Sequence, residues 1–125
     1  MPSKKANKYG TRCEYAAAER YDLELARCSW HDGIRQGSIP VEIKATRRRH
    51  ADGQPGNFKL YHKYHRKLRR NNGEYVFVLY RKRGKGTEVL KMTNSHSSSL
   101  PRLNWHGGGD HRSTKQAKLS IEEVF

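Results

Sequence analysis

The run Glu74 to Tyr80 is the feature that most restricts how this chain folds. It reads Glu-Tyr-Val-Phe-Val-Leu-Tyr, and β-branched and aromatic residues favour a β-strand. Because successive residues of the run are apolar, both faces of this strand are expected to be covered. Only 21 of the 125 residues are Leu, Ile, Val or Phe. The core is therefore small, and its stability is expected to depend on a partner subunit or on nucleic acid.

The first helix is predicted to begin at Thr11. Thr11 and Glu14 have the spacing of a capping box, and good helix formers follow as far as Arg20. Residues 21–28 alternate, which fits either a strand or a helix end followed by a strand. Residues 1–9 are expected to form a disordered basic arm, and residues 10–125 a single domain.

Residues 38–45 have the alternation of a strand. Ile39, Val41 and Ile43 fall on one face, and Glu42 and Lys44 fall on the other. An Asp-Gly pair at 32–33 predicts a turn before this strand.

Residues 58–70 are predicted to form a helix that ends at the Asn-Asn-Gly of 71–73. Four large side chains recur at spacings of 3, 4 and 3, namely Phe58, Tyr61, His65 and Leu68. Four cations recur at spacings of 4, 3 and 4, namely Lys59, Lys63, Arg66 and Arg70. They would form one basic stripe suited to backbone phosphates.

The remaining pattern completes an α/β domain. Residues 87–92 are expected to pair with 75–80 as a hairpin across a Gly-Lys-Gly turn. Residues 93–112 form a polar loop anchored by Trp105, and residues 119–125 a short helix or strand. The order of helices and strands predicts one mixed sheet flanked by helices.

The charge of the chain favours a polyanionic partner. Lys and Arg number 26 against 12 Asp and Glu, which gives a formal net charge of +14. The basic runs are spread along the chain, so a folded domain would be basic on several sides. No run approaches the ~20 apolar residues of a membrane span. The N-terminus lacks a secretory signal, and two cysteines are too few for a disulfide scaffold. An intracellular nucleic-acid-binding protein is expected.

Asp32, Glu42 and Lys44 form the candidate catalytic group. Residues two apart on a strand share a face, so Glu42 and Lys44 lie together. Two carboxylates can hold a hard divalent cation such as Mg²⁺, which would polarise a phosphodiester. A neighbouring ammonium can stabilise the charge that develops. Glu-x-Lys alone is a weak motif, and an exposed charge pair is the alternative interpretation. Asp32, which lies ten residues before Glu42, favours the catalytic interpretation.

The arrangement of Glu14 on a first helix, then Asp32, then Val41-Glu42-Ile43-Lys44 on a strand resembles the PD-(D/E)XK nuclease superfamily. It is most similar to the small archaeal Holliday junction resolvases and their archaeal-viral relatives, over roughly residues 9–80. The resemblance implies a restriction-endonuclease-like core and Mg²⁺-dependent phosphodiester hydrolysis, with Mn²⁺ as a substitute. It also implies a homodimer located in the cytoplasm, or in the host cytoplasm for a viral protein.

The resemblance also implies roles for individual residues. Asp32 and Glu42 would be the metal ligands, often joined by the carbonyl of Ile43, and Lys44 would be the catalytic lysine. Glu14 matches a catalytic carboxylate on the first helix that lies near the metal. His31 stands where the family has Pro, and it is expected to support the adjacent ligand from outside the metal's own shell.

The expected DNA contacts are the cations that flank this group in sequence: Arg47, Arg48, Arg49, Lys59, Lys63, Arg66 and Arg70. None of the predicted helices is typical of a major-groove reader, so recognition of DNA shape is expected. His62 and His65 are expected to be phosphate contacts or helix surface, because no Cys-x-x-Cys accompanies them to form a zinc site. The Gly-rich stretch 105–112 is either a surface loop or a loop that contacts DNA.

Two functions are therefore compared. The first is a metal-dependent DNA endonuclease that prefers branched DNA, and the alternative is a non-catalytic basic nucleic-acid-binding module. A pure binder gains nothing from Asp32 and Glu42 inside a basic surface, where they repel phosphate. A nuclease needs them, because the bound cation reverses their sign.

Overall fold

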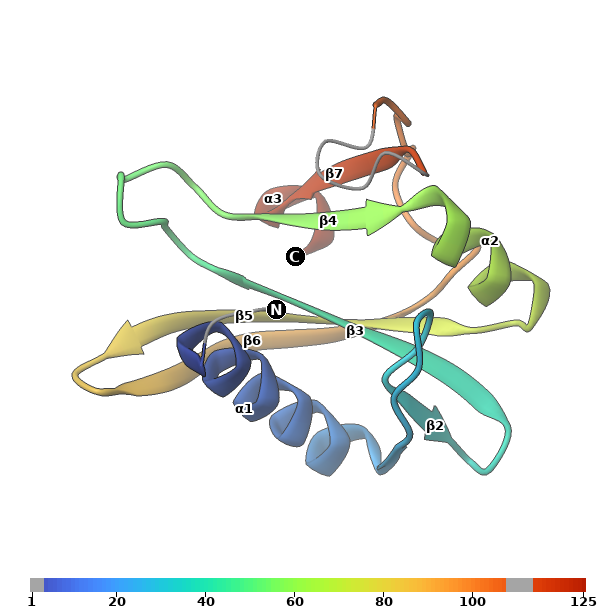
Figure 1. The fold of residues 1–125 in the computed structure, drawn as a ribbon, viewed down its shortest axis with the longest axis horizontal. Coiled ribbons are helices and arrows are strands. Elements are labelled where there is room, and N and C mark those ends of the chain that lie inside the picture. Colours follow the sequence, from blue (N-terminus) through green and yellow to red (C-terminus); the bar gives the residue numbers. More distant parts are fainter. Residues whose placement is uncertain (1–3, 108–113) are drawn as a thin grey trace.

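The computed structural model describes residues 4–107 and 114–125 (Figure 1). Its elements in chain order are α1 (Lys4–Tyr21), β1 (Leu23–Leu25), β2 (Gly33–Arg35), β3 (Ile39–Arg47), β4 (Asn57–Tyr61), α2 (His62–Arg70), β5 (Glu74–Arg83), β6 (Gly86–His96), β7 (Gln116–Ser120) and α3 (Ile121–Val124). A five-stranded sheet has the order β1-β2-β3-β5-β6, and a second sheet pairs β4 with β7. The predicted α/β class, with a central mixed sheet flanked by helices, is confirmed.

β5 is covered on both faces, as its apolar run predicted. Figure 1 shows α1 on one side of the central sheet and the β4–β7 sheet with α2 and α3 on the other. Val76 and Val78 pack toward α1 in a core that includes Cys13. Tyr75 and Phe77 belong to the second core, beneath β4 and β7. The alternation of β5 therefore divides the molecule into two small cores.

The connection between β3 and β5 brings the second layer over the sheet. These strands are parallel, with Glu42 beside Tyr75 and Lys44 beside Phe77. Parallel neighbours need a crossover, because a tight turn can join only antiparallel strands. The crossover consists of β4 and α2, and it leaves β4 close to β3.

The prediction of a helix over 58–70 is wrong in its first third, because 57–61 is the strand β4. Phe58 and Leu60 are both buried and pair in register with Leu119 and Ala117 of β7. The ring of Phe58 also lies edge-on to Phe77, with centroids 4.9 Å apart. The side chains of this segment therefore alternate as in a strand. Lys59, the exposed residue between Phe58 and Leu60, does not share a helix face with the cations of α2.

Other boundaries also differ from the predictions. α1 begins at Lys4 rather than at Thr11, so residues 4–9 of the expected disordered arm are helical, while residues 1–3 lie outside the described range. The predicted 32–33 turn is wrong, because β2 starts at Gly33 and the turn lies at residues 36–38. β6 runs beyond the predicted end at 92, as far as His96.

The two segments with open alternatives are now assigned. α1 ends at Tyr21 and is followed by the strand β1, so residues 21–28 contain a helix end and then a strand. Residues 116–120 form β7, and α3 follows it. Among the described parts of the chain, none of the helices has the length and apolarity that a membrane crossing requires.

Candidate active site

The alternation of β3 places Glu42 and Lys44 on one face of the central sheet. Val41 and Ile43 are buried in the core against α1. Side chains alternate along a strand, so Glu42 and Lys44 lie on the opposite face, beside Tyr75 and Phe77 of β5. This is the face that β4 and α2 partly cover (Figure 1).

Asp32 is held against β3 by two hydrogen bonds to the backbone of that strand. Its amide donates to the carbonyl of Val41 at 2.8 Å. Its carboxylate Oδ2 accepts a hydrogen bond from the amide of Ile43 at 2.7 Å. The second bond is made to Ile43, the residue between Glu42 and Lys44, so Asp32, Glu42 and Lys44 meet at one short stretch of β3.

The carboxyl groups of Asp32 and Glu42 are in contact. Burial raises the pKa of Glu42 to about 9, and a hydrogen bond with Asp32 adds to the shift while the charge of Lys44 opposes it. The side chains of Glu42 and Asp32 therefore lie close enough to interact. Two acid side chains this close form a pair that a cation can bridge.

Glu14 on α1 lies near Asp32 but has its own counterion. Burial raises the pKa of Glu14, and the charge of Asp32 is the next cause. The guanidinium of Arg27 lies 2.5 Å from the Glu14 carboxylate. Over residues 4–107 and 114–125, no group of three or more His, Cys, Asp or Glu side chains is placed to hold a metal together. Asp32 and Glu42 therefore remain the candidate ligand pair among the described residues.

Lys44 lies next to an aromatic ring that the sequence did not identify as part of the site. Its Nζ is 5.4 Å from the centroid of the Tyr61 ring. An ammonium at this distance from a ring face is attracted by the ring quadrupole. Tyr61 is the last residue of β4, so the position of Lys44 depends on the strand that sequence reasoning interpreted as helix.

A buried aromatic pair underlies Glu42. Nδ1 of His65 and the hydroxyl of Tyr75 are 2.8 Å apart, and their rings stack. Burial lowers the pKa of His65 to about 4. Burial also raises the pKa of Tyr75, with a further contribution from the charge of Glu42. The expectation that His65 lies on the helix surface is wrong, because the Trp105 ring also packs against it.

His31 lies directly beside Asp32, as its position in the sequence requires. Its ring meets Trp30 edge-on at 4.6 Å. Its Nδ1 is buried, and none of the described residues hydrogen-bonds to it. The environment of His31 is therefore compact and partly apolar.

The predicted DNA contacts occupy three elements. Arg47 ends β3, and Arg48 and Arg49 follow it as exposed side chains. Lys59 is exposed on β4, directly opposite Lys118 of β7. The last group is exposed on α2 and consists of Lys63, Arg66 and Arg70. The sequence did not indicate that Lys118 lies beside Lys59, because nothing in it tells which strand pairs with 57–61. Most of the Gly-rich stretch 105–112 lies outside the described residues.

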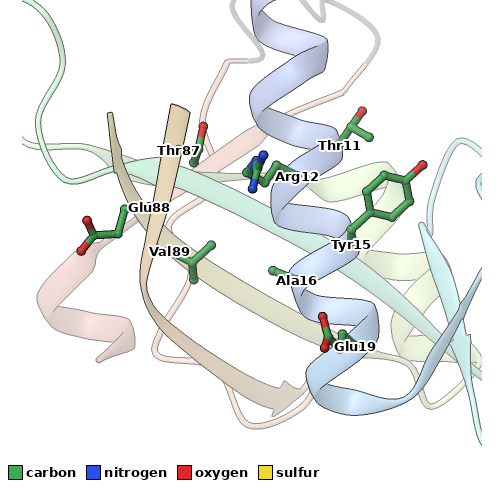
Figure 2. A pocket seen from close by; sticks show the side chains of 8 residues that line it. All are labelled: Thr11, Arg12, Tyr15, Ala16, Glu19, Thr87, Glu88 and Val89. Carbon is green, nitrogen blue, oxygen red and sulfur yellow. The ribbon is translucent and has the colours of Figure 1, made fainter. Parts of the chain in front are cut away.

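A further cavity lies away from this group. It has a volume of about 860 Å³ and lies between α1 and β6. Figure 2 shows Ala16 and Val89 facing each other across it, with Tyr15 and Glu88 at its rims. Its lining contains no pair of acidic side chains in hydrogen-bond contact and no nucleophile beside a base. It therefore lacks the chemistry that Asp32, Glu42 and Lys44 bring together.

Comparison with known proteins identifies the family. A family model described as a PD-(D/E)XK nuclease superfamily domain matches residues 1–125. The chain belongs to the PD-(D/E)XK nuclease superfamily. Searches of curated proteins and of solved structures found no match. Membership makes the central sheet the restriction-endonuclease-like core that was predicted, and it supports a nuclease that acts on nucleic acid.

Nucleases of the PD-(D/E)XK superfamily generally use divalent metals. The donor set of this member fits such an ion, because Asp32 and Glu42 offer hard carboxylate oxygens in direct contact. One Asp32 oxygen, Oδ2, accepts a hydrogen bond from the amide of Ile43, which orients the carboxylate.

Proposed function

We propose that this chain is a Mg²⁺-dependent DNA endonuclease in which Asp32 and Glu42 hold the metal and Lys44 acts on the phosphate. The supporting observation is the interaction between the Asp32 and Glu42 carboxyls, with Lys44 two residues after Glu42 on the same face of β3. A half-buried acid pair inside a chain of charge +14 is difficult to explain by binding alone.

Each residue has a distinct part in the proposal. Asp32 and Glu42 bind the cation, which supplies Lewis acidity when it is bound. Lys44 stabilises the negative charge that develops on the phosphodiester. Glu14, neutralised in part by Arg27, acts through its charge on Asp32. His31 restricts the movement of Asp32.

The cations around the group are proposed to position the DNA. They are Arg47, Arg48, Arg49, Lys59, Lys63, Arg66 and Arg70. Contacts of this kind go to phosphates and carry no sequence information, so selectivity would come from the shape of the DNA. The resemblance to junction resolvases makes a four-way junction the branched substrate to test and a homodimer the oligomeric state to test.

A cleavage assay tests the proposal. The protein is mixed with labelled duplex, single strand and four-way junction in the presence of Mg²⁺, Mn²⁺ or EDTA. We expect cleavage only with metal, and a loss of about 10²–10³-fold in Lys44→Ala. Glu42→Ala is expected to abolish cleavage and to retain DNA binding without metal. Glu24→Ala and Lys91→Ala remove exposed charges elsewhere and serve as controls.

The outcomes of this assay distinguish the endonuclease from the non-catalytic binding module. Binding of all three nucleic acids with no cleavage under either metal would favour the non-catalytic binding module. Cleavage by Glu42→Ala at the wild-type rate would show that the catalytic group has been assigned wrongly.

A further inference from the structure

A cationic groove begins at Lys44 and extends away from the acid pair. It has a volume of about 510 Å³ and lies between β3 and the β4–β7 sheet. Its cationic lining comes from three strands: Lys44, Arg47, Lys59 and Lys118. None of the described residues that line it is acidic, so its field is positive throughout.

Two of these lysines oppose each other across a strand pair. Lys59 and Lys118 are directly opposite in the antiparallel register of β4 and β7, and both are exposed. Like charges in this arrangement repel and destabilise the sheet. Their buried neighbours, such as Phe58 and Leu119, fix the register, so the lysines cannot move apart by a slip. An anion bound between them would remove the repulsion.

The groove is continuous with further cations. Arg47 also lines a neighbouring depression of about 320 Å³, together with Arg48, Arg49, Arg81 and Lys82. Arg47 is thus shared between the two hollows, at the end of β3 remote from Glu42. The positive surface therefore leads from Lys44 along β3 to the end of the strand.

We propose that this groove binds the phosphodiester backbone of the strand that is cut, on one side of the cleaved bond, with Lys59 and Lys118 holding one phosphate region between them. The assignment of the cleaved bond rests on the proposed nuclease function. A hollow of about 510 Å³ has the size of a small-molecule site, so it takes a short stretch of one strand. The bound strand would leave Lys44 toward Arg47.

The test uses the whole protein with both lysines replaced. Affinity for a labelled single strand and a labelled duplex is measured by fluorescence anisotropy in EDTA at several salt concentrations. We expect Lys59→Ala/Lys118→Ala to bind more weakly and to reduce the slope of log affinity against log salt by about 2. The control Arg12→Ala/Arg20→Ala removes two exposed cations from α1 and is expected to keep the wild-type slope. Thermal unfolding checks that both proteins are folded.

The outcomes separate this inference from the nuclease proposal. A double lysine variant with the affinity and the salt dependence of the wild type would overturn the proposal that the groove binds DNA. This holds whether or not the wild type cleaves DNA. A reduced slope in the lysine variant alone would support the groove as a backbone site, even for a wild type that does not cleave. Equal losses in both double variants would indicate a general effect of charge and would overturn the inference.

Discussion

The carboxylate of Asp32 accepts a hydrogen bond from the backbone amide of Ile43 at 2.7 Å. This bond ties the segment before β2 to the middle of β3, between Glu42 and Lys44. It gives Asp32 a structural role in addition to the metal-binding role proposed for it. Replacement by asparagine separates the two roles, because an amide side chain keeps the hydrogen-bond acceptor and loses the charge.

We therefore expect Asp32→Asn to be more stable than Asp32→Ala. Asparagine can still accept from Ile43, whereas alanine leaves that amide without its partner, at a cost of about 1–3 kcal/mol. Both variants are expected to lose cleavage, since neither supplies a carboxylate. Urea unfolding measures the stability, and the cleavage assay measures the activity. Equal stability of the two variants would show that the hydrogen bond between Asp32 and the Ile43 amide does not stabilise the fold.

Glu74 joins three strands of the central sheet. Its carboxylate accepts hydrogen bonds from Arg35 of β2 and from Asn94 of β6, both at 2.9 Å. Burial opposes ionisation, but these bonds hold the pKa of Glu74 below its ordinary value. We expect Glu74→Ala to lower the free energy of unfolding by about 2–3 kcal/mol.

Glu88→Ala is the matched control for that change. Glu88 also pairs with two arginines, at the exposed end of the β5–β6 hairpin. Exposed pairs contribute little, so its loss is expected to be much smaller than that of Glu74. Chemical denaturation of both variants makes the comparison. A similar loss in the two would mean that burial of the Glu74 pair is unimportant.

His65 is expected to make stability depend on pH. Its pKa is lowered by burial from 6.5 to about 4 in the folded state, so the unfolded chain binds its proton at higher pH. The stabilisation is fully present above pH 6.5 and is lost as the pH falls toward 4. The slope is at most about 1.4 kcal/mol per pH unit.

Urea unfolding over this range measures the slope. The His65→Phe variant is expected to show a shallower dependence than the wild type, because it removes the titrating group. The His106→Ala variant loses an exposed histidine and is expected to keep the wild-type slope. A His65→Phe profile parallel to the wild type would rule out this origin of the pH dependence.

Gly56 allows β4 to approach β3. A Cβ atom at this position would collide with the carbonyl of Arg47 and the hydroxyl of Thr46. We expect Gly56→Ala to cost about 1–3 kcal/mol, because the strands must separate. Gly107→Ala is the control, since none of the described residues other than its chain neighbours lies within 4 Å of the added methyl group. Thermal unfolding measures both, and a Gly56→Ala protein as stable as the control would contradict the close approach.

Parts of the fold and of the site could be predicted because they follow from local patterns. The alternation of β3 alone requires that Glu42 and Lys44 share a face, whatever packs around them. The apolar run of β5 likewise requires cover on both faces. These features depend on neighbours within one strand, which the sequence presents directly.

Other parts depend on residues far along the chain. Residues 57–61 carry both a helical and an alternating pattern, and pairing with β7 selects the strand. That choice also moves Lys59 away from α2 and brings it opposite Lys118. The burial of His65 depends in the same way on Tyr75 and Trp105.

The sequence by itself thus determined which residues share a strand face and which acids and lysine form the candidate catalytic group. It also determined that the surface is basic. Only the tertiary structure decided that Asp32 contacts Glu42, that Tyr61 lies beside Lys44, and that a groove leads from Lys44 past two opposed lysines. The physical reason is that periodicity is a property of one segment. A contact between segments depends on how all of them bury their apolar faces together.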